Sequence, residues 1–166
     1  YPGAKLWIIG KKDQNFVDSY LMPVCTRYQM VWADAASDNP EGDIVSWGYV
    51  SEEKKLELLS RSWALVFPSI REGWGIPVTE AGCVGTPCIA FDSPGICEAI
   101  NYGKAGYLCT ENTTDGLAEQ MRKVISEKAL YESMQESAYQ YSSQFCWDDT
   151  GREFGKFIER LLKVRG

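Results

Sequence analysis

The chain has 166 residues, of which 45% are apolar, 24% are charged and 13% are aromatic. This composition is typical of one globular domain that buries its core without disulfides or metals, and it argues against disorder. The net charge of −6 argues against general nucleic-acid binding, and the apolar runs are too short to span a bilayer. The N-terminal residues show no signal-peptide pattern.

Histidine is absent, which excludes Ser-His-Asp and Cys-His catalysis and histidine-based metal chemistry within this chain. The cysteines form no C-x-x-C pair, so neither a zinc centre nor a disulfide framework is predicted. We expect the cysteines to be buried free thiols of a protein in a reducing compartment. They are Cys25, Cys83, Cys88, Cys97, Cys109 and Cys146.

The first part of the chain alternates apolar runs with helical and turn-forming segments. A short buried strand is predicted at residues 4–9, and a helix over about 14–35 that Pro23 kinks or splits. The turn-forming residues at 37–42 predict a loop, and the apolar run at 44–50 predicts a second strand.

The middle of the chain continues the alternation. Ser51 is typical of a helix N-cap because acidic residues follow it in the first turn. A strand is predicted at 64–67, and after a glycine-containing loop a helix opens near Pro77. The next strand is predicted at 88–91, and a short helix at 96–101.

A fifth short strand is predicted at 106–109, and helical periodicity continues from there, with helices at 114–126, 128–142 and 148–164. Strands that alternate with helices indicate an α/β, Rossmann-like parallel sheet with helices on both faces. The near-continuous apolar character of the strands fits a sheet covered on both sides. No repeat or composition change divides the chain, so a single domain is predicted over residues 1–166.

Two carboxylates bracket the loop between the third strand and the following helix. Glu72 and Glu80 are separated by seven residues, which include Gly73 and Gly75. The glycines allow a sugar ring to lie against the backbone, and a helix N-terminus offers N–H groups to a polar ligand. Glu80 is expected in the first turn of the helix, where the helix dipole favours the ionised carboxylate and both its oxygens can accept hydrogen bonds from a diol.

Two glutamates at this spacing are weak evidence alone, but their surroundings form a recognisable frame. That frame contains Pro68-Ser69 before the motif, Glu72-Gly-Trp-Gly75 within it, Gly85-Thr-Pro87 after it, and less specific stretches at 6–10, 47–50 and 145–147. It resembles the C-terminal donor-binding half of a GT-B retaining glycosyltransferase of the group 1 type, which carries a Glu-x7-Glu motif. The resemblance covers nearly the whole chain.

The resemblance implies a site for a nucleotide-diphosphate sugar of the GDP-mannose or UDP-glucose type, with no obligatory metal or redox cofactor. Glu72 would be the catalytic residue beside the transferred sugar, and Glu80 would bind the ribose. The other implied donor-binding residues are Val50, Lys55, Ser69, Gly73, Trp74, Gly75, Ile76, Val78 and Gly95. Val50 would meet the base through its backbone, and the N–H of Val78 would face the phosphate.

Several of these residues also have purely structural interpretations. Glu72 also fits a solvated loop acid and Glu80 a simple helix N-terminal acid, while Trp74 suits either the core or a pocket wall. The turn after Pro94 accounts for Gly95 without a ligand, and an exposed i,i+3 charge pair accounts for Lys55.

The family pattern also includes an Arg and a Lys that neutralise the diphosphate, on a strand–helix unit expected before this chain. We therefore expect a piece of a longer enzyme, inactive by itself, whose remaining half binds a glycan or lipid-linked acceptor. A cytoplasmic location is expected, and peripheral association with the inner face of a membrane stays open. The nucleotide and the sugar are not determined by the sequence.

Other functions stay open beside the transferase. One is another GT-B enzyme, either a nucleotide-sugar epimerase or a phosphorylase. Another is a non-catalytic sugar-nucleotide-binding module. A dehydrogenase and a P-loop ATPase are disfavoured because the chain contains neither G-x-G-x-x-G nor G-x4-G-K-[ST].

Overall fold

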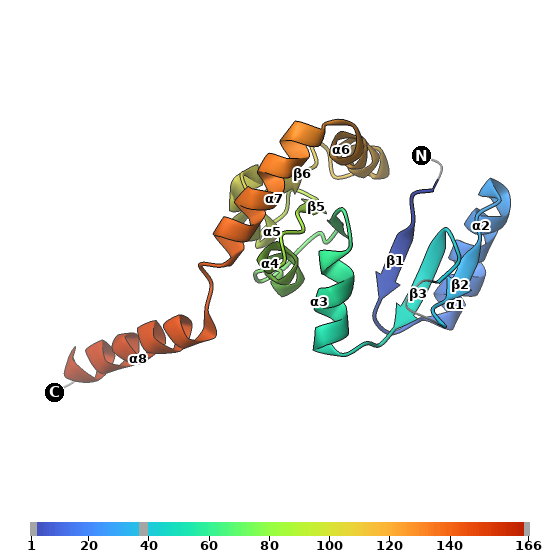
Figure 1. The fold of residues 1–166 in the computed structure, drawn as a ribbon. Coiled ribbons are helices and arrows are strands. Elements are labelled where there is room, and N and C mark those ends of the chain that lie inside the picture. The colour runs from blue at the N-terminus through green and yellow to red at the C-terminus, as the bar shows by residue number, and fades with distance from the viewer. Residues whose placement is uncertain (1–2, 37–39, 165–166) are drawn as a thin grey trace. The chain divides into compact units, whose positions relative to one another are not determined.

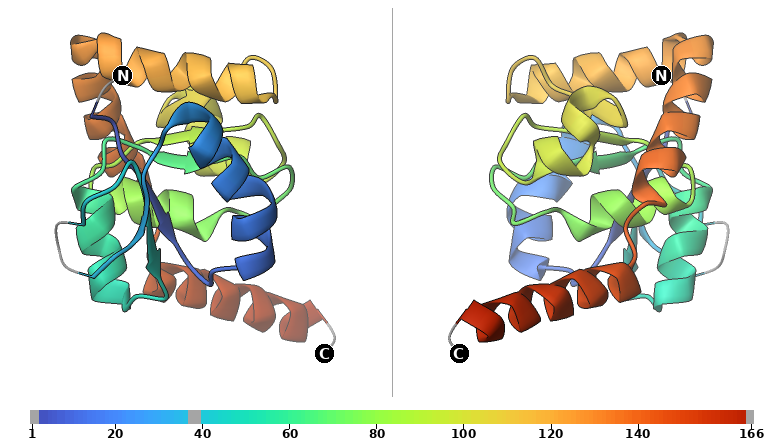
Figure 2. Two further views of the ribbon diagram at one scale, coloured as in Figure 1. Left: turned by 90° about the vertical axis from the view of Figure 1, so that its right-hand side faces the viewer. Right: turned by 90° about the vertical axis from the view of Figure 1, so that its left-hand side faces the viewer.

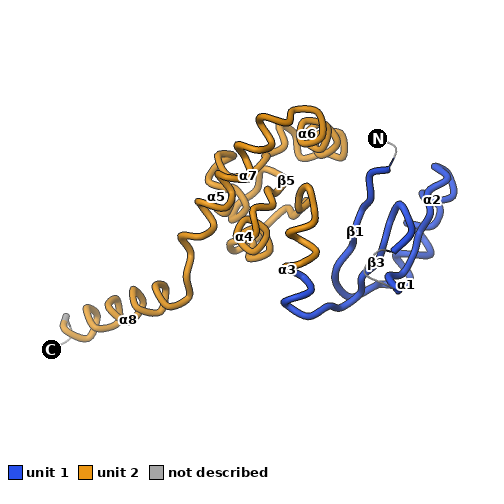
Figure 3. Tube along the Cα trace, in the orientation of Figure 1, with its two compact units in different colours: residues 1–55 blue, residues 56–166 orange. Residues whose placement is uncertain are grey.

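The computed structural model describes residues 3–36 and 40–164. The chain divides into two compact units, Tyr1–Lys55 and Leu56–Gly166 (Figure 3). Each unit contains a three-stranded sheet, and every strand pairing among the described residues is parallel. The predicted α/β class with parallel strands is therefore confirmed.

The first unit is built on a sheet with strand order β1-β3-β2 (Figure 1). Leu6 of β1 and Trp32 of β2 both lie opposite Ile44 of β3, so β3 is the central strand. The bounds of its elements are Leu6–Ile9 for β1, Gln14–Phe16 for α1, Val17–Leu21 for the π-helical segment η1, Met22–Tyr28 for α2, Trp32–Asp34 for β2 and Ile44–Gly48 for β3.

The predicted helix over 14–35 is wrong beyond Tyr28. Gln29 adopts a left-handed conformation, with φ of 55° and ψ of 36°, and its N–H donates to the last carbonyls of α2, which ends the helix. The chain then extends into β2, which pairs with the central strand. Pro23 lies in the first turn of α2, directly after η1, where its missing N–H costs little. Residues 37–39 of the predicted loop lie outside the described residues.

The second unit has a sheet with strand order β4-β5-β6. The helix α3, Glu52–Ser60, leads into it from the first unit. The remaining elements are β4 at Leu65–Phe67, α4 at Ile76–Cys83, β5 at Cys88–Ala90, α5 at Ile96–Ala99, the 3-10 turn η2 at Asn101–Gly103, β6 at Gly106–Leu108, α6 at Thr114–Ser126, α7 at Lys128–Ser142 and α8 at Trp147–Val164.

Both faces of this second sheet are covered. Cys88 and Ala90 of β5 pack in one buried cluster with residues of α4 and α5. Ile89, between them, packs in another cluster with Val124 of α6 and Met134 of α7. Because successive side chains of a strand point to opposite faces, α4 and α5 cover one face, and α6 and α7 cover the other. The predicted helical cover is confirmed here.

The last helix follows α7 after a short turn and is the dark red segment of Figure 2. All its side chains are exposed through Lys163. None of the described helices combines the length and the apolar composition that crossing a membrane requires.

The expectation of buried thiols is only partly confirmed. All six cysteines are free, and Cys25, Cys88 and Cys109 are buried. Cys83 and Cys146 are exposed, so the prediction is wrong for these two, which lie at the end of α4 and just before α8.

Candidate functional site

Three loops leave the carboxyl edge of the second sheet, because β4, β5 and β6 are parallel. The loops after β5 and β6 are joined at Asp92 and Asn112. The Asp92 N–H donates to Asn112 Oδ1, and Asn112 Nδ2 donates back to the Asp92 carbonyl, both at 2.8 Å. Ser93, which is 4% exposed, donates from Oγ to the Ser69 carbonyl at 2.9 Å. The loop after β4 is thereby tied to the other two.

Glu72 is held at this edge by its side chain and by its backbone. Its carboxylate Oε1 accepts a hydrogen bond from Ser69 Oγ at 2.8 Å, and its N–H donates to the Pro94 carbonyl at 3.2 Å. The residue is half-buried, which is unlike a fully solvated loop acid. The predicted donor residue Ser69 thus contacts the predicted catalytic residue directly.

The glycine loop leads straight into α4. Gly75 has φ of 87°, and it precedes the first helical residue, Ile76. Within the described part of the chain, no backbone carbonyl accepts from the N–H groups of residues 73–76. N–H groups without a backbone acceptor at the start of a helix can donate to a polar ligand. The Val78 N–H differs from the prediction because it donates to the Gly75 carbonyl at 2.9 Å and is not free for a phosphate.

The Trp74 ring packs inward. Its edge-to-face contact with Phe145 has a centroid separation of 4.9 Å, and its Nε1 donates to Thr79 Oγ1 at 2.9 Å. The side chain also packs against the buried cluster of α4, β5 and α5. These contacts give Trp74 a structural role; a sugar contact for this residue stays a prediction.

Glu80 lies deeper in α4 than predicted. The helix begins at Ile76, so Glu80 belongs to its second turn, and the first turn contains no acidic residue. The helix dipole acts mainly within the first turn, so it does not supply the expected stabilisation of the Glu80 carboxylate. Glu80 is half-buried, and its predicted ribose contact rests on its place beside the glycine loop.

Gly95 supports the loop that carries Glu72. A side chain at this position would collide with the Glu72 carbonyl group, whose carbon lies 2.8 Å from the ideal Cβ position. The Gly95 N–H donates to Glu98 Oε2 at 2.8 Å. Its φ of 82° also disfavours any residue with a side chain. A direct contact of Gly95 with the donor stays a prediction.

The remaining predicted donor residues belong to the first unit. Val50 is half-buried between β3 and α3, and Lys55 forms an i,i+3 ion pair with Glu52 at 2.6 Å. The charge pair that the sequence offered as the structural interpretation of Lys55 is thus present. Their contacts with the donor stay predictions.

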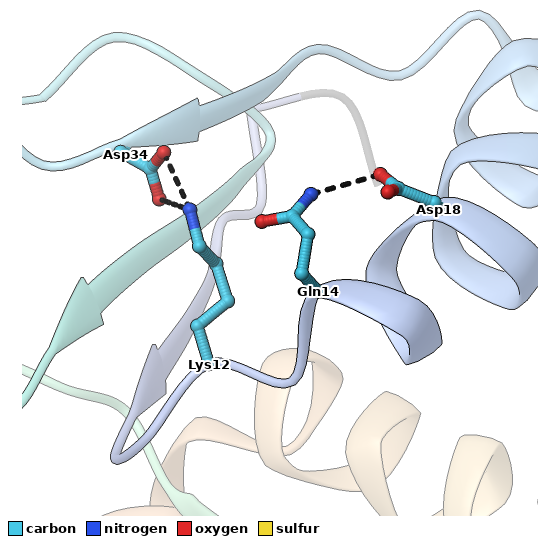
Figure 4. A network of polar contacts seen from close by, with 4 residues as sticks. All are labelled: Lys12, Gln14, Asp18 and Asp34. Carbon is cyan, nitrogen blue, oxygen red and sulfur yellow. Dashed lines mark hydrogen bonds and ion pairs between the residues drawn. The ribbon is translucent and has the colours of Figure 1, made fainter.

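The carboxyl edge of the first sheet is also polar. Lys12, after β1, donates to both carboxylate oxygens of Asp34 at the end of β2, at 2.9 and 3.0 Å (Figure 4). Nearby, Gln14 donates to Asp18 at 2.8 Å. Tyr49, just after β3, is 92% exposed. Tyr49 was not among the predicted site residues, although an aromatic residue directly after the last glycine of a strand is a local signal.

Ser93, Asn112 and Glu98 of the second unit were not among the predicted site residues, and the partners of Ser93 and Asn112 are distant in the sequence. Ser93 and Asn112 hold the loops together, and Glu98 holds Gly95. For Glu98 alone a local signal exists, since a glutamate three residues after a helix-start residue is the pattern of a reciprocal cap. Among the described residues, no three His, Cys, Asp or Glu side chains gather closely enough to hold a metal ion.

The sequence is similar to a known family and to characterised relatives. Residues 29–141 match the family of glycosyl transferases, group 1. Glycogen synthase of Mycobacterium tuberculosis is 33% identical over 148 residues, which cover 89% of this chain and 33% of that protein. Trehalose phosphorylase of Grifola frondosa is 39% identical over 70 residues, which cover 42% of this chain and 10% of that protein. The chain therefore spans a third or less of these relatives.

A solved structure agrees with the fold. The crystal structure of Anabaena HepE in complex with UDP-glucose matches 96% of this chain and 42% of its own chain, with a TM-score of 0.79 at 19% identity. This likeness shows the fold. Because the family match covers well over half of the sequence, the chain belongs to the group 1 glycosyltransferases.

Proposed function

We propose that this chain forms the donor-binding part of a retaining hexosyltransferase that uses a nucleoside diphosphate sugar. The observation that carries the proposal is the loop after β4. There Ser69 donates to the Glu72 carboxylate, and within the described residues no backbone carbonyl accepts from the N–H groups of the next residues, 73–76. A carboxylate and such N–H donors in one loop suit a ligand that carries both hydroxyl groups and phosphate oxygens.

In the proposed reaction, the bond between the sugar C1 and the diphosphate oxygen breaks. A bond between C1 and the acceptor oxygen forms on the same face of the ring, and the acceptor proton passes to the leaving phosphate. Glu72 contacts hydroxyls of the transferred sugar and stabilises the positive charge that develops on its ring. The N–H groups of residues 73–76 hold the sugar, and Glu80 accepts the two ribose hydroxyls. The proposed reaction has no obligatory metal or redox cofactor.

A UDP-sugar is the first donor to test, because HepE, which shares the fold, was crystallised with UDP-glucose. GDP-mannose is the second. In the first unit, Val50 contacts the base through its backbone, and the exposed ring of Tyr49 offers a stacking surface at the same sheet edge. The acceptor is a glycan or a lipid-linked acceptor, bound outside this chain, and the enzyme acts in the cytoplasm or at the inner face of the membrane.

The test separates the two carboxylates in the protein that carries this chain. Calorimetry with UDP-glucose, GDP-mannose and ADP-glucose first identifies the donor. Glu80→Ala should then raise the donor Kd by about 10- to 100-fold, because hydrogen bonds to a charged group are lost. Glu72→Gln should lower kcat by about 100-fold or more and leave the nucleoside diphosphate Kd nearly unchanged.

The matched control is Glu132→Gln, which changes an exposed glutamate of α7 that forms a surface ion pair with Lys128 at 3.6 Å. This variant should change neither the donor Kd nor kcat. An unchanged donor Kd in Glu80→Ala would contradict the ribose role of Glu80. A normal kcat in Glu72→Gln would contradict the catalytic role of Glu72.

A phosphorylase is the second candidate, because trehalose phosphorylase of Grifola frondosa is similar over 70 residues. A phosphorylase transfers the sugar between inorganic phosphate and a sugar acceptor, so its turnover requires inorganic phosphate and no nucleotide. Measuring turnover separately with a nucleotide sugar and with inorganic phosphate distinguishes the transferase from the phosphorylase. Epimerisation of the donor without any acceptor would indicate an epimerase, and donor binding without turnover would indicate a binding module.

A further inference from the structure

The loop that carries Glu72 does not stand alone; it rests on the loop Asp92–Gly95 after β5. Three contacts join them: Ser93 Oγ donates to the Ser69 carbonyl at 2.9 Å, the Glu72 N–H donates to the Pro94 carbonyl at 3.2 Å, and Gly95 packs against the Glu72 carbonyl group. The position of Glu72 is thus set by the conformation of the second loop.

Glu98 fixes that conformation. Its Oε2 accepts the Gly95 N–H at 2.8 Å, which holds Gly95 at its unusual φ of 82°. The Glu98 carbonyl in turn accepts from Tyr141 Oη of α7 at 2.8 Å. A hydrogen bond to a charged acceptor is stronger than one between neutral groups, and this one is partly buried. A continuous chain of contacts therefore runs from Tyr141 through Glu98 and Gly95 to Glu72.

We propose that Glu98 is a positioning residue for Glu72, acting through Gly95. The proposal rests on the catalytic role of Glu72 proposed above. Glu80 lies on α4, outside the two loops that these contacts join. Loss of Glu98 therefore displaces the sugar side of the site and leaves the nucleotide side in place, so turnover and nucleotide affinity respond differently.

The experiment compares Glu98→Ala, Glu98→Gln and the control Glu132→Ala in the protein that carries these residues. The first measurement is amide hydrogen exchange in the 69–75 segment, where the Glu72 N–H reports the contact with Pro94. Glu98→Ala should speed this exchange by about tenfold, as expected from the loss of one charge-assisted hydrogen bond. Glu98→Gln keeps an acceptor oxygen for Gly95 and should restore the protection, and Glu132→Ala should not change it.

The second measurement is the kinetic constants with the donor that calorimetry identifies. Glu98→Ala should lower kcat by about tenfold and change the nucleoside diphosphate Kd by less than about threefold, while Glu98→Gln recovers most of the activity. Unchanged exchange in Glu98→Ala overturns the proposal. So does a loss of nucleotide affinity equal to the loss of kcat, or a Glu98→Gln variant as impaired as Glu98→Ala.

Two further comparisons keep the outcome clear. If Glu98→Ala does not fold, Tyr141→Phe is tested in its place, because it keeps the ring and removes only the hydrogen bond to the Glu98 carbonyl. Amide exchange in the 69–75 segment must then be faster, and unchanged exchange overturns the proposal. Amide exchange is measured without turnover, so it tests the positioning role of Glu98 separately from the catalytic role of Glu72. If Glu72→Gln is inactive and Glu98→Ala exchanges normally, only the positioning role fails; if exchange rises but Glu72→Gln turns over normally, the proposed function fails.

Discussion

Gly82 lies in α4 where this helix meets the end of α7. A side chain at this position would overlap Ser142 of α7: the ideal Cβ position lies 2.7 Å from the Ser142 Cβ and 3.0 Å from the Ala138 carbonyl oxygen, and the Ser142 Oγ is closer still. Ser142 is 3% exposed and therefore has no open space into which it can move. Two effects of Gly82→Ala thus oppose each other, the gain in helix propensity and the steric overlap with α7.

The steric overlap with α7 should outweigh the gain in helix propensity. Replacing glycine by alanine inside a helix gains about 1 kcal/mol, while overpacking a core costs about 1–3 kcal/mol. The upper part of that range applies, because side-chain rotation does not relieve contacts with a Cβ and a backbone oxygen. We expect Gly82→Ala to lower the free energy of unfolding by about 1–2 kcal/mol, which corresponds to about 2–8 °C in Tm for a chain of this size.

Urea denaturation of the 166-residue chain measures this change. The control is Gly155→Ala in α8, where nothing lies within 4 Å of the ideal Cβ, so that variant should not be destabilised. Adding Ser142→Gly to Gly82→Ala should recover at least about 1 kcal/mol as coupling energy. An increase in stability for Gly82→Ala alone would refute the close packing of α4 on α7.

Two further predictions concern ionisable groups with a raised pKa, the buried Tyr107 and the half-buried Cys97. Burial is the main cause that raises the pKa of Tyr107 to about 12, and the nearby Tyr131 and Glu127 add to it. Tyrosine in the unfolded chain ionises at a lower pH, so the contribution of Tyr107 to the free energy of unfolding should be full below pH ~10. It should be lost between pH ~10 and ~12. Tyr107→Phe should abolish this loss in pH-dependent denaturation without lowering stability at pH 7, since its hydroxyl has no hydrogen-bond partner among the described groups. Burial and the contact with Asp92 raise the pKa of Cys97. At pH ~8.5, iodoacetamide should therefore alkylate Cys97 more slowly in the folded chain than in urea, as followed by mass spectrometry. Asp92→Asn should reduce this difference in alkylation rate between the folded and the unfolded chain.

The strands and most helices could be predicted because local signals mark them. The apolar run before Pro68 and the N-cap pattern at Ser51 both lie where an element ends or begins. The strand at Trp32–Asp34 was missed because the preceding helix ends at Gln29, in a left-handed conformation for which the sequence has no glycine. A glutamine is a rare residue there, so the helical pattern seemed to continue.

The site was predictable to the extent that it is local. Glu72, the glycine loop and Glu80 lie within one short segment, and their order along the chain indicated a loop that enters a helix. The partners of Glu72 were not predictable, because Ser93 and Pro94 follow only after another complete helix and strand. Nothing in a single sequence says which buried serine donates to which distant carbonyl.

The structure shows that the two carboxylates of the motif are held by different parts of the fold. Glu72 depends on the contact between two loops, which involves Ser69 and the residues after β5. Glu80 depends on α4, whose position is set by close packing on α7 at Gly82. With the proposed roles, changes in the loop contacts should act on the transferred sugar. Changes between α4 and α7 should act on both sides of the site, because Tyr141, the neighbour of Ser142 in α7, donates to the Glu98 carbonyl. A loop variant combined with Gly82→Ala should therefore show coupled effects on kcat and on nucleotide Kd, and strictly additive effects would mean that the two supports act independently.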